Sequence, residues 1–449
     1  MQMVLFSLIL SGLLAWPGTL LADKPRSPTI DGWTVNAPRD EIRPEFFIAS
    51  ERPLRLGIRA DARPGLQGYW TRSFPVQGGE YYRFSADFTA PGVTSLRRSA
   101  VVKLHWRDAA GNKVPQDADV LTSELKNYQA MAEAEHPRID NGAVTGRAAD
   151  TYRAPTQATQ AIIELHLQWA RQAEIVWSDI SLTPTAAPPP RKVKLAAVHF
   201  IPKGPTAAES CTQYDPLVEK ARQQGAELIV LGETINVVNS GREAADVAEP
   251  IPGPSSDHFC RLARQHDTHI VVGLFEKDGP LVYNSSVLCG PAGQIIGKYR
   301  KVTLPRDEIA AGVTPGTEYP VFETRFGKLG MMICYDGFYP EVARELSMNG
   351  AEVIAWPVWG CNPLLASARA CENHVYLVSS TFTDVASHWT QTAIYDHAGH
   401  ALVIGQEWGD IAITEVDLSR PTRWPSLGDF RSGISRHKPE TVPESSPPR

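Results

Sequence analysis

The segment GKLGMMICYDGFYPEVARELSMNGAEVIAWP, residues 327–357, decides the fold. Its apolar run LGMMI predicts a buried strand, and Cys334 begins the turn that follows. Pro340 suits the first turn of a helix, Gly350 suits its C-terminal cap, and AEVIAWP predicts a second buried strand. Because open α/β sheets collect their sites outside the carboxyl ends of strands, a cysteine at a strand exit is placed to meet a ligand.

Strands and helices alternate through residues 193–430. The segments VKLAAVHF, AELIVLGE and THIVVGLFE predict strands, and YDPLVEKARQQG and SSDHFCRLARQHD between them predict helices. The segment LVYNSSVLCGPAGQIIGKYRK predicts a hairpin of antiparallel strands. This mixture indicates an α/β layered domain that contains mixed sheets.

Residues 24–183 have a different pattern, with short β-type segments and little helical periodicity. Apolar and polar residues alternate in AIIELHLQW, which predicts an antiparallel β-sandwich. This part resembles the jelly-roll, galactose-binding-like modules of many secreted enzymes, and the resemblance makes carbohydrate the candidate ligand of this domain. Core packing is the competing interpretation of its aromatic residues, which are Trp70, Tyr81, Tyr82, Trp106, Trp169 and Trp177. The proline-rich residues 184–192 predict a semi-stiff linker.

The two ends of the chain suggest export and a flexible tail. Residues 1–22 resemble a signal peptide, with an apolar run that Pro17 interrupts and Ala22 before the cleavage point. The predicted location is therefore periplasmic or extracellular, although an uncleaved anchor is the alternative because no Lys or Arg precedes the run and Leu20 is bulky. Residues 431–449 are rich in Ser, Pro and Arg and predict a disordered tail.

The net charge and the cysteines limit the partners and cofactors that the chain is expected to have. The net charge is −6 and charged residues make up 21% of the chain, which gives no reason to expect a nucleic-acid or anionic membrane partner. All 6 cysteines lie beyond residue 210, and their spacing does not exclude a disulfide among them. No second ligand pair at metal-site spacing accompanies Cys371 and His374, so we expect both to pack within a helical region and we expect no metal.

Three reactive side chains lie at or directly after the ends of predicted strands. Glu233 ends AELIVLGE, Lys301 follows IIGKYR, and Cys334 ends KLGMMIC. A thiolate is a nucleophile, a carboxylate can accept its proton, and an ammonium group stabilises the anion that develops. Together these residues predict covalent thiol catalysis.

These residues lie in sequence blocks that resemble the nitrilase, or carbon–nitrogen hydrolase, superfamily. The blocks are GAELIVLGET (225–234), GKYRKVTLP (297–305) and GMMICYDGFYPEVAREL (330–346). WPVWG and RACENHVYLVSS also fit, and the resemblance covers about residues 193–420. It implies a four-layer α-β-β-α sandwich that associates into homo-oligomers and uses no metal or organic cofactor.

The resemblance also implies a role for each matching residue. Glu233 is expected to be the general base, Lys301 the oxyanion stabiliser aided by the Tyr335 N–H, and Cys334 the nucleophile. Glu308 in LPRDEIAAGVTPG is expected to be a second glutamate that orients substrate and lysine. Two departures, Gly232 before the base and Thr303 two residues after the lysine, remove no reacting group. Near these motifs, Tyr335, Trp359 and Asn362 are candidates for substrate binding, with buried packing as the alternative.

We therefore expect a hydrolase that cleaves a non-peptide C–N bond in a small amide or N-carbamoyl compound through a cysteine acyl-enzyme. One alternative is an N-acyltransferase that passes the same thioester to an amine. The other is a catalytically silent binding protein in which the β-sandwich is the working part.

Overall fold

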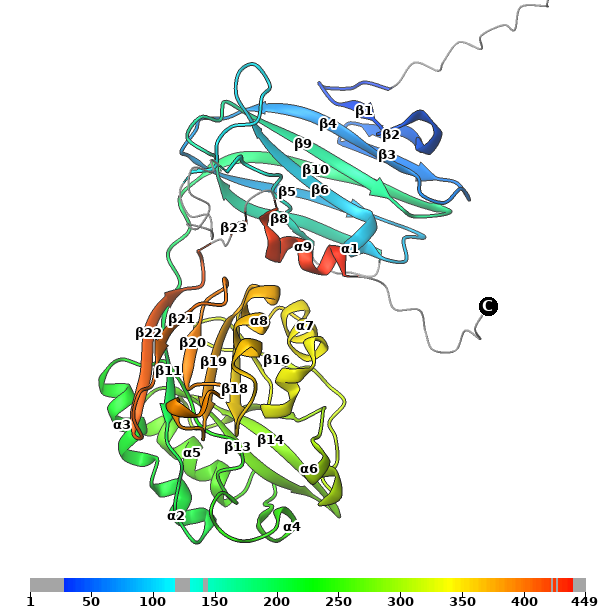
Figure 1. Cartoon of the computed structure of the whole chain (residues 1–449). Coiled ribbons are helices and arrows are strands. Elements are labelled where there is room, and N and C mark those ends of the chain that lie inside the picture. The colour runs from blue at the N-terminus through cyan, green and yellow to red at the C-terminus, as the bar shows by residue number, and fades with distance from the viewer. Residues whose placement is uncertain (1–27, 118–129, 140–143, 421–422, 425–426, 439–449) are drawn as a thin grey trace, which may run out of the picture.

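The computed structural model describes residues 28–117, 130–139, 144–420, 423–424 and 427–438. The predicted signal peptide at 1–22 lies outside this range. Within it, no helix is both long and apolar enough to span a membrane. The described chain forms two bodies, an upstream β-sandwich and a downstream α/β domain, with helix α9 (Phe430–His437) beside the sandwich (Figure 1).

The upstream body is a sandwich of two antiparallel sheets. The first has the order β1 (Thr34–Asn36), β4 (Gln67–Pro75), β9 (Gln160–Gln168) and β6 (Ala100–Arg107). The second has the order β2 (Glu45–Glu51), β3 (Leu54–Ala60), β10 (Ala173–Thr185), β5 (Tyr81–Thr89), β8 (Thr145–Arg153) and β7 (Arg138–Ile139). The short helices η1 (Asp40–Ile42) and α1 (Leu96–Ser99) complete it. Alternate residues of β5 and of the first part of β9 are buried, as the alternation of apolar and polar residues predicts.

Most of the candidate sugar-stacking aromatics belong to the core of this sandwich. Trp70, Trp106 and Trp177 are fully buried, and Tyr82 is nearly so. Trp169 is half-exposed, with the guanidinium of Arg98 over its ring. Three indoles therefore serve packing, and carbohydrate binding by this domain stays a prediction from the sequence.

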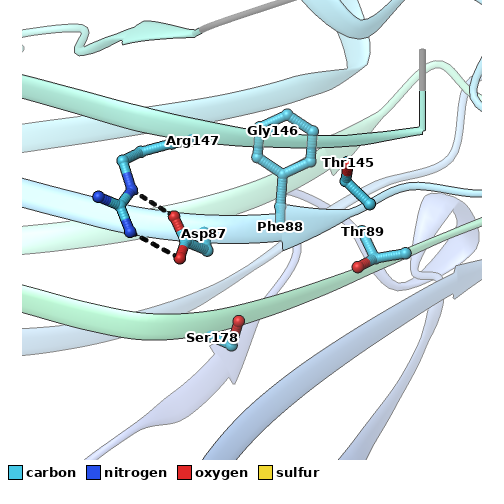
Figure 2. A pocket seen from close by; sticks show the side chains of 7 residues that line it. All are labelled: Asp87, Phe88, Thr89, Thr145, Gly146, Arg147 and Ser178. Atoms are coloured by element: carbon cyan, nitrogen blue, oxygen red, sulfur yellow. Dashed lines mark hydrogen bonds and ion pairs between the residues drawn. The ribbon is translucent and has the colours of Figure 1, made fainter. Parts of the chain in front are cut away.

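An open depression lies over strands β5, β8 and β10 of the sandwich (Figure 2). Asp87 and Arg147 pair across it, with Nη2 of the arginine 2.8 Å from a carboxylate oxygen. Phe88, Thr89, Thr145, Gly146 and Ser178 form the rest of its lining. Because the charged groups in the depression satisfy each other, it carries no sign of a ligand.

The downstream domain contains two sheets of mixed direction. The first has the order β15 (Ile295–Arg300), β14 (Leu281–Cys289), β13 (His269–Asp278), β12 (Leu228–Val230), β11 (Lys192–His199) and β22 (Asp410–Asp417). The second has the order β16 (Val321–Glu323), β17 (Lys328–Met331), β18 (Val353–Val358), β19 (Tyr376–Thr381), β20 (Ala393–Tyr395) and β21 (Ala401–Ile404). In each sheet three strands are parallel, and the strand next to them on either side is antiparallel to them. The outer strands β15 and β21 pair antiparallel with β14 and β20.

Three apolar clusters define four layers in this domain. Leu195, Val230, Met331 and Val378 represent the cluster that fills the space between the sheets. A second cluster lies under α2 (Ala207–Thr212), α3 (Asp215–Gln223) and α5 (Pro254–Gln265), on the outer face of the first sheet. A third lies under α7 (Pro340–Met348) and α8 (Pro363–Asn373), on the outer face of the second. The predicted α-β-β-α sandwich preceded by an antiparallel β-sandwich is confirmed (Figure 1).

The remaining short elements lie in connecting segments and near the C-terminus. They are α4 (Ala244–Val247), α6 (Arg306–Ala310), η2 (Cys334–Phe338), η3 (Val385–Ser387), β23 (Arg423–Trp424) and β24 (Gly428–Asp429).

The junction between the domains and the C-terminal segment differ from the sequence predictions. Strand β10 continues through Pro184 to Thr185, so the first residues of the expected linker pair with β5. The prediction of disorder from residue 431 was wrong over α9, whose Ile434 is buried. Arg431 on this helix donates to the carbonyl of Ala351 at 2.7 Å. These contacts are tertiary, so the polar composition of the segment did not reveal them; residues 439–449 lie outside the described range.

Candidate active site

The fold brings the predicted triad residues to one end of the two facing sheets. Glu233 follows β12, Lys301 follows β15, and Cys334 begins η2 just after β17. Lys301 Nζ donates to Oε1 of Glu233 at 3.1 Å and to Oε1 of Glu308 at 2.7 Å. Lys301 and Glu233 are 1% and 3% exposed, so this is a buried cluster of one cation and two carboxylates.

Asn284 in the middle of β14 joins the same cluster, and sequence analysis did not find it. Its Nδ2 donates to Oε1 of Glu233 at 2.8 Å and to Oε1 of Glu308 at 2.9 Å. The Lys301 N–H donates to the Asn284 carbonyl, so strand pairing sets the lysine opposite the asparagine. The only sequence signal was a polar YNSS run inside an otherwise apolar strand.

Cys334 has a backbone conformation that is unusual for a residue with a side chain. Its φ is +40°, in the left-handed region that non-glycine residues seldom occupy. Its carbonyl accepts a hydrogen bond from Trp356 Nε1 at 3.3 Å, and its Sγ lies 3.7 Å from the carbonyl oxygen of Gly360. Strained backbone at one residue persists only where the surroundings hold it, which is common at functional sites.

Asp336 supplies much of that support, and it too was missed from the sequence. This fully buried carboxylate accepts hydrogen bonds from the Ile333 N–H at 2.9 Å and from the Tyr299 hydroxyl at 2.7 Å. It also accepts from the Thr303 N–H at 3.0 Å and the Thr303 hydroxyl at 2.6 Å. Asp336 therefore ties the turn that carries Cys334 to the segment that carries Lys301.

The electrostatics favour a protonated thiol next to a charged lysine. Burial and then the charge of Glu233 raise the pKa of Cys334, and the charge of Lys301 only partly offsets them. Burial alone lowers the pKa of Lys301, but the neighbouring Glu233, Cys334 and Glu308 reverse this and hold it above its usual range. Burial raises the pKa of Glu308. The site therefore favours the protonated form of the Cys334 thiol, with the Glu233 carboxylate and the Lys301 ammonium nearby.

Two polar atoms of the cluster have no hydrogen-bond partner within the described part of the chain. They are Oε2 of Glu308 and Oδ1 of Asn284. Buried polar groups are normally paired, so such atoms indicate room for a polar ligand or water. No group of His, Cys, Asp and Glu in the described ranges could hold a metal ion.

The three predicted substrate-binding residues lie in different settings. The Trp359 N–H donates to Oε2 of Glu233 at 2.7 Å, and its indole is half-exposed. Tyr335 is partly buried and contacts the rings of Phe338 and Tyr339. Asn362 is the N-cap of α8, and its side-chain oxygen accepts from the Leu364 N–H at 3.0 Å. A capping role therefore already occupies the oxygen of Asn362.

Cys371 and His374, which the sequence places in a helical region, lie at the end of α8. Cys371 lies on α8, and His374 caps the end of that helix with a φ of +50°. His374 Nε2 accepts a hydrogen bond from the indole N–H of Trp424 in the C-terminal segment. The neighbouring Arg369 donates to the carbonyl of Gly337 in the turn after Cys334, at 3.1 Å.

Comparison with known proteins gives concordant matches. A family model described as carbon–nitrogen hydrolase matches residues 194–426. A nitrilase of Pyrococcus abyssi is 37% identical over 195 residues, which are 42% of this chain and 74% of that protein. The omega-amidase NIT2 of Xenopus tropicalis is 28% identical over 239 residues, covering 49% of this chain and 83% of that protein.

Among solved structures, Nit3 of Saccharomyces cerevisiae, a member of branch 10 of the nitrilase superfamily, is similar to part of this chain. The match has 25% sequence identity and a TM-score of 0.46, and it covers 50% of this chain and 90% of that one.

Proposed function

The chain belongs to the carbon–nitrogen hydrolase family, and from this we propose that it hydrolyses a non-peptide C–N bond of a small amide or N-carbamoyl compound through a thioester on Cys334. The observation that carries the proposal is the buried Glu233–Lys301–Glu308 cluster next to the strained cysteine. The similarity to an omega-amidase supports an amide as the substrate class.

In the first half-reaction the Cys334 sulfur attacks the carbonyl carbon while its proton moves to Glu233. Negative charge then develops on the carbonyl oxygen, where the Lys301 ammonium and the Tyr335 N–H are the proposed donors. The C–N bond breaks, the amine or ammonia leaves with the proton from Glu233, and an acyl-thioester remains on Cys334.

In the second half-reaction Glu233 accepts a proton from water, and the water oxygen attacks the thioester carbonyl. The C–S bond breaks, a carboxylic acid leaves, and sulfur regains a proton. Glu233 is suited to both steps because Lys301 and Asn284 hold one of its oxygens and the Trp359 N–H holds the other.

Glu308 is proposed to orient both the lysine and the substrate. Its Oε1 accepts from Lys301 and Asn284, whereas its Oε2 has no partner among the described residues. A free carboxylate oxygen can accept an N–H of the substrate amide, which places the scissile bond beside the lysine.

The proposal is tested by ammonia release from a panel of primary amides, ω-amides of dicarboxylic acids, N-carbamoyl amino acids and nitriles. The intact chain is expected to act on at least one amide or N-carbamoyl compound, and Cys334→Ala to lose at least about 10³-fold in kcat/KM. Cys371→Ala is the matched control and should keep activity. Equal activity of Cys334→Ala and the intact chain would refute the thioester.

The acyltransferase alternative is separated by adding an amine acceptor such as hydroxylamine to the same assay. A hydrolase gives mainly the free acid at modest acceptor concentration, whereas an acyltransferase gives mainly the amide of the acceptor. Export, homo-oligomer formation and carbohydrate binding by the sandwich stay predictions from the sequence.

A further inference from the structure

Two cysteines that take no part in the proposed chemistry lie against each other in the downstream domain. Cys260 is on α5, and Cys289 is the last residue of β14. Their Sγ atoms are 2.8 Å apart. Both side chains are buried in the cluster between the first sheet and its helices, with Cys289 fully enclosed and Cys260 5% exposed.

The other cysteines do not share this arrangement. All 6 lie in the described part of the chain, and there the Cys260–Cys289 contact is the only one that joins two sulfur atoms. Cys361 is buried at the start of the α8 segment, and Cys211 is buried on α2. The proposed nucleophile Cys334 has Sγ against the Gly360 carbonyl and not against another thiol.

We propose that Cys260 and Cys289 form a structural disulfide when the chain folds in an oxidising compartment. A disulfide has a sulfur–sulfur bond of about 2.05 Å, so the two sulfurs need to approach by only about 0.8 Å from where they lie. A movement of this size is within the reach of small χ1 adjustments of the two side chains.

The oxidant is a disulfide compound, either a small one such as oxidised glutathione or a protein disulfide of an oxidoreductase. One cysteine thiolate attacks the oxidant and forms a mixed disulfide, releasing one reduced thiol. The second cysteine then attacks its neighbour's sulfur, which forms the Cys260–Cys289 bond and releases the second reduced thiol. Because both sulfurs are enclosed in the finished fold, the exchange takes place during folding.

The bond would fasten a covering helix to the sheet that carries part of the candidate site. The chain between the two cysteines includes all of β13, which pairs with both β12 and β14. Glu233 follows β12 and Asn284 lies on β14, so the crosslink supports the sheet behind both residues. It does so while leaving Cys334 as a free thiol.

The test compares the full chain made in an oxidising compartment with the same chain made in a reducing one. Each sample is unfolded in the presence of N-ethylmaleimide without reductant, digested with trypsin and analysed by mass spectrometry. Tryptic cleavage leaves Cys260 in the peptide 243–261 and Cys289 in the peptide 278–298, each with one cysteine. We expect these peptides to be joined, and lighter by two hydrogens than their sum, in the oxidised sample alone.

Thermal unfolding provides a second readout with a matched control. Reduction of the oxidised chain should lower its Tm by about 5–10 °C, because a disulfide across a loop of this size stabilises the folded state relative to the unfolded chain. The Cys260→Ala/Cys289→Ala variant should show no such dependence, and Cys211→Ala should keep it. Alkylation of both cysteines in the oxidised sample, or joining of either one to a different cysteine, would overturn the proposal.

Discussion

Replacing Glu233 by glutamine should change the reactivity of Cys334 and the hydrolytic activity in opposite directions. The carboxylate of Glu233 raises the pKa of the cysteine thiol, so its removal stabilises the thiolate. Lys301 keeps its second carboxylate partner in the variant, because Glu308 lies 2.7 Å from Nζ. The cation beside the sulfur is therefore retained.

The size of the effect follows from Coulomb's law. Charges that perturb a neighbouring pKa typically lie within about 4–6 Å and, at an effective dielectric constant of about 20, act with about 3 kcal/mol, which is about two pKa units. At neutral pH the thiolate fraction of Glu233→Gln should then be about 100-fold larger than in the unaltered chain. A thiolate of lower pKa is intrinsically less nucleophilic, by about 10-fold here, so alkylation should accelerate by about 10-fold.

The assay is iodoacetamide labelling of Cys334, followed by mass spectrometry of the tryptic peptide 329–344 between pH 6 and pH 10. Cys334 is partly exposed, so a small reagent can reach it. Labelling of the unaltered chain should keep rising with pH above neutrality, because its thiol pKa is raised. Hydrolysis by Glu233→Gln should fall by about 10²–10⁴ through loss of the general base.

The exposed Asp307, replaced by asparagine, controls for a general change of charge near the site. If labelling of Glu233→Gln slows in parallel with hydrolysis, the electrostatic argument is wrong, and Glu233 would instead hold the cysteine in place.

Three further predictions concern buried polar residues of the downstream domain. The side chain of Asp336→Asn can accept from only one of the two backbone N–H groups that the carboxylate pairs with. The free energy of unfolding should therefore fall by about 1–3 kcal/mol, and kcat should fall too. Equal stability of the two proteins in calorimetry would contradict this prediction. Asn284→Ala removes the amide hydrogen bonds to Glu233 and Glu308, so kcat/KM should fall by about 10–100-fold. An unchanged kcat/KM would show that Asn284 does not contribute to the active site. Glu276 accepts hydrogen bonds from Arg300, Lys298 and Ser285, and despite burial these bonds lower its pKa from 4.5 to about 2. The stabilisation that the ionised carboxylate provides is therefore present above pH 4.5 and is lost as the pH falls toward 2. Glu276→Gln should flatten the acid-unfolding curve over that window, and an unchanged curve would contradict this role of Glu276.

The sequence revealed the parts of the molecule that local patterns encode. Glu233, Lys301 and Cys334 each follow a segment whose pattern predicted a strand, and active sites collect outside the carboxyl ends of strands in α/β sheets, so their meeting could be predicted. The layered downstream domain and the upstream sandwich were predicted for the same reason, since strand alternation and helix periodicity are local signals.

The features that sequence analysis missed depend on register and tertiary contact. Asn284 faces the two glutamates only because strand pairing places it opposite Lys301. Asp336 lies in the turn after Cys334, and its partners Tyr299 and Thr303 come 37 and 33 residues earlier in the chain. Helix α9 forms where composition predicted disorder, because the sandwich and the carbonyl groups near Ala351 provide its contacts.

The most direct test of the account is to detect the acyl-thioester on Cys334. The chain would be mixed with the best amide of the panel, quenched in acid within the first turnovers and digested, and the peptide 329–344 would be weighed. The account predicts a mass increase equal to the acyl group on Cys334, which hydroxylamine removes and which Cys334→Ala lacks. Steady hydrolysis without any such adduct, even in a variant slowed at deacylation, would contradict it.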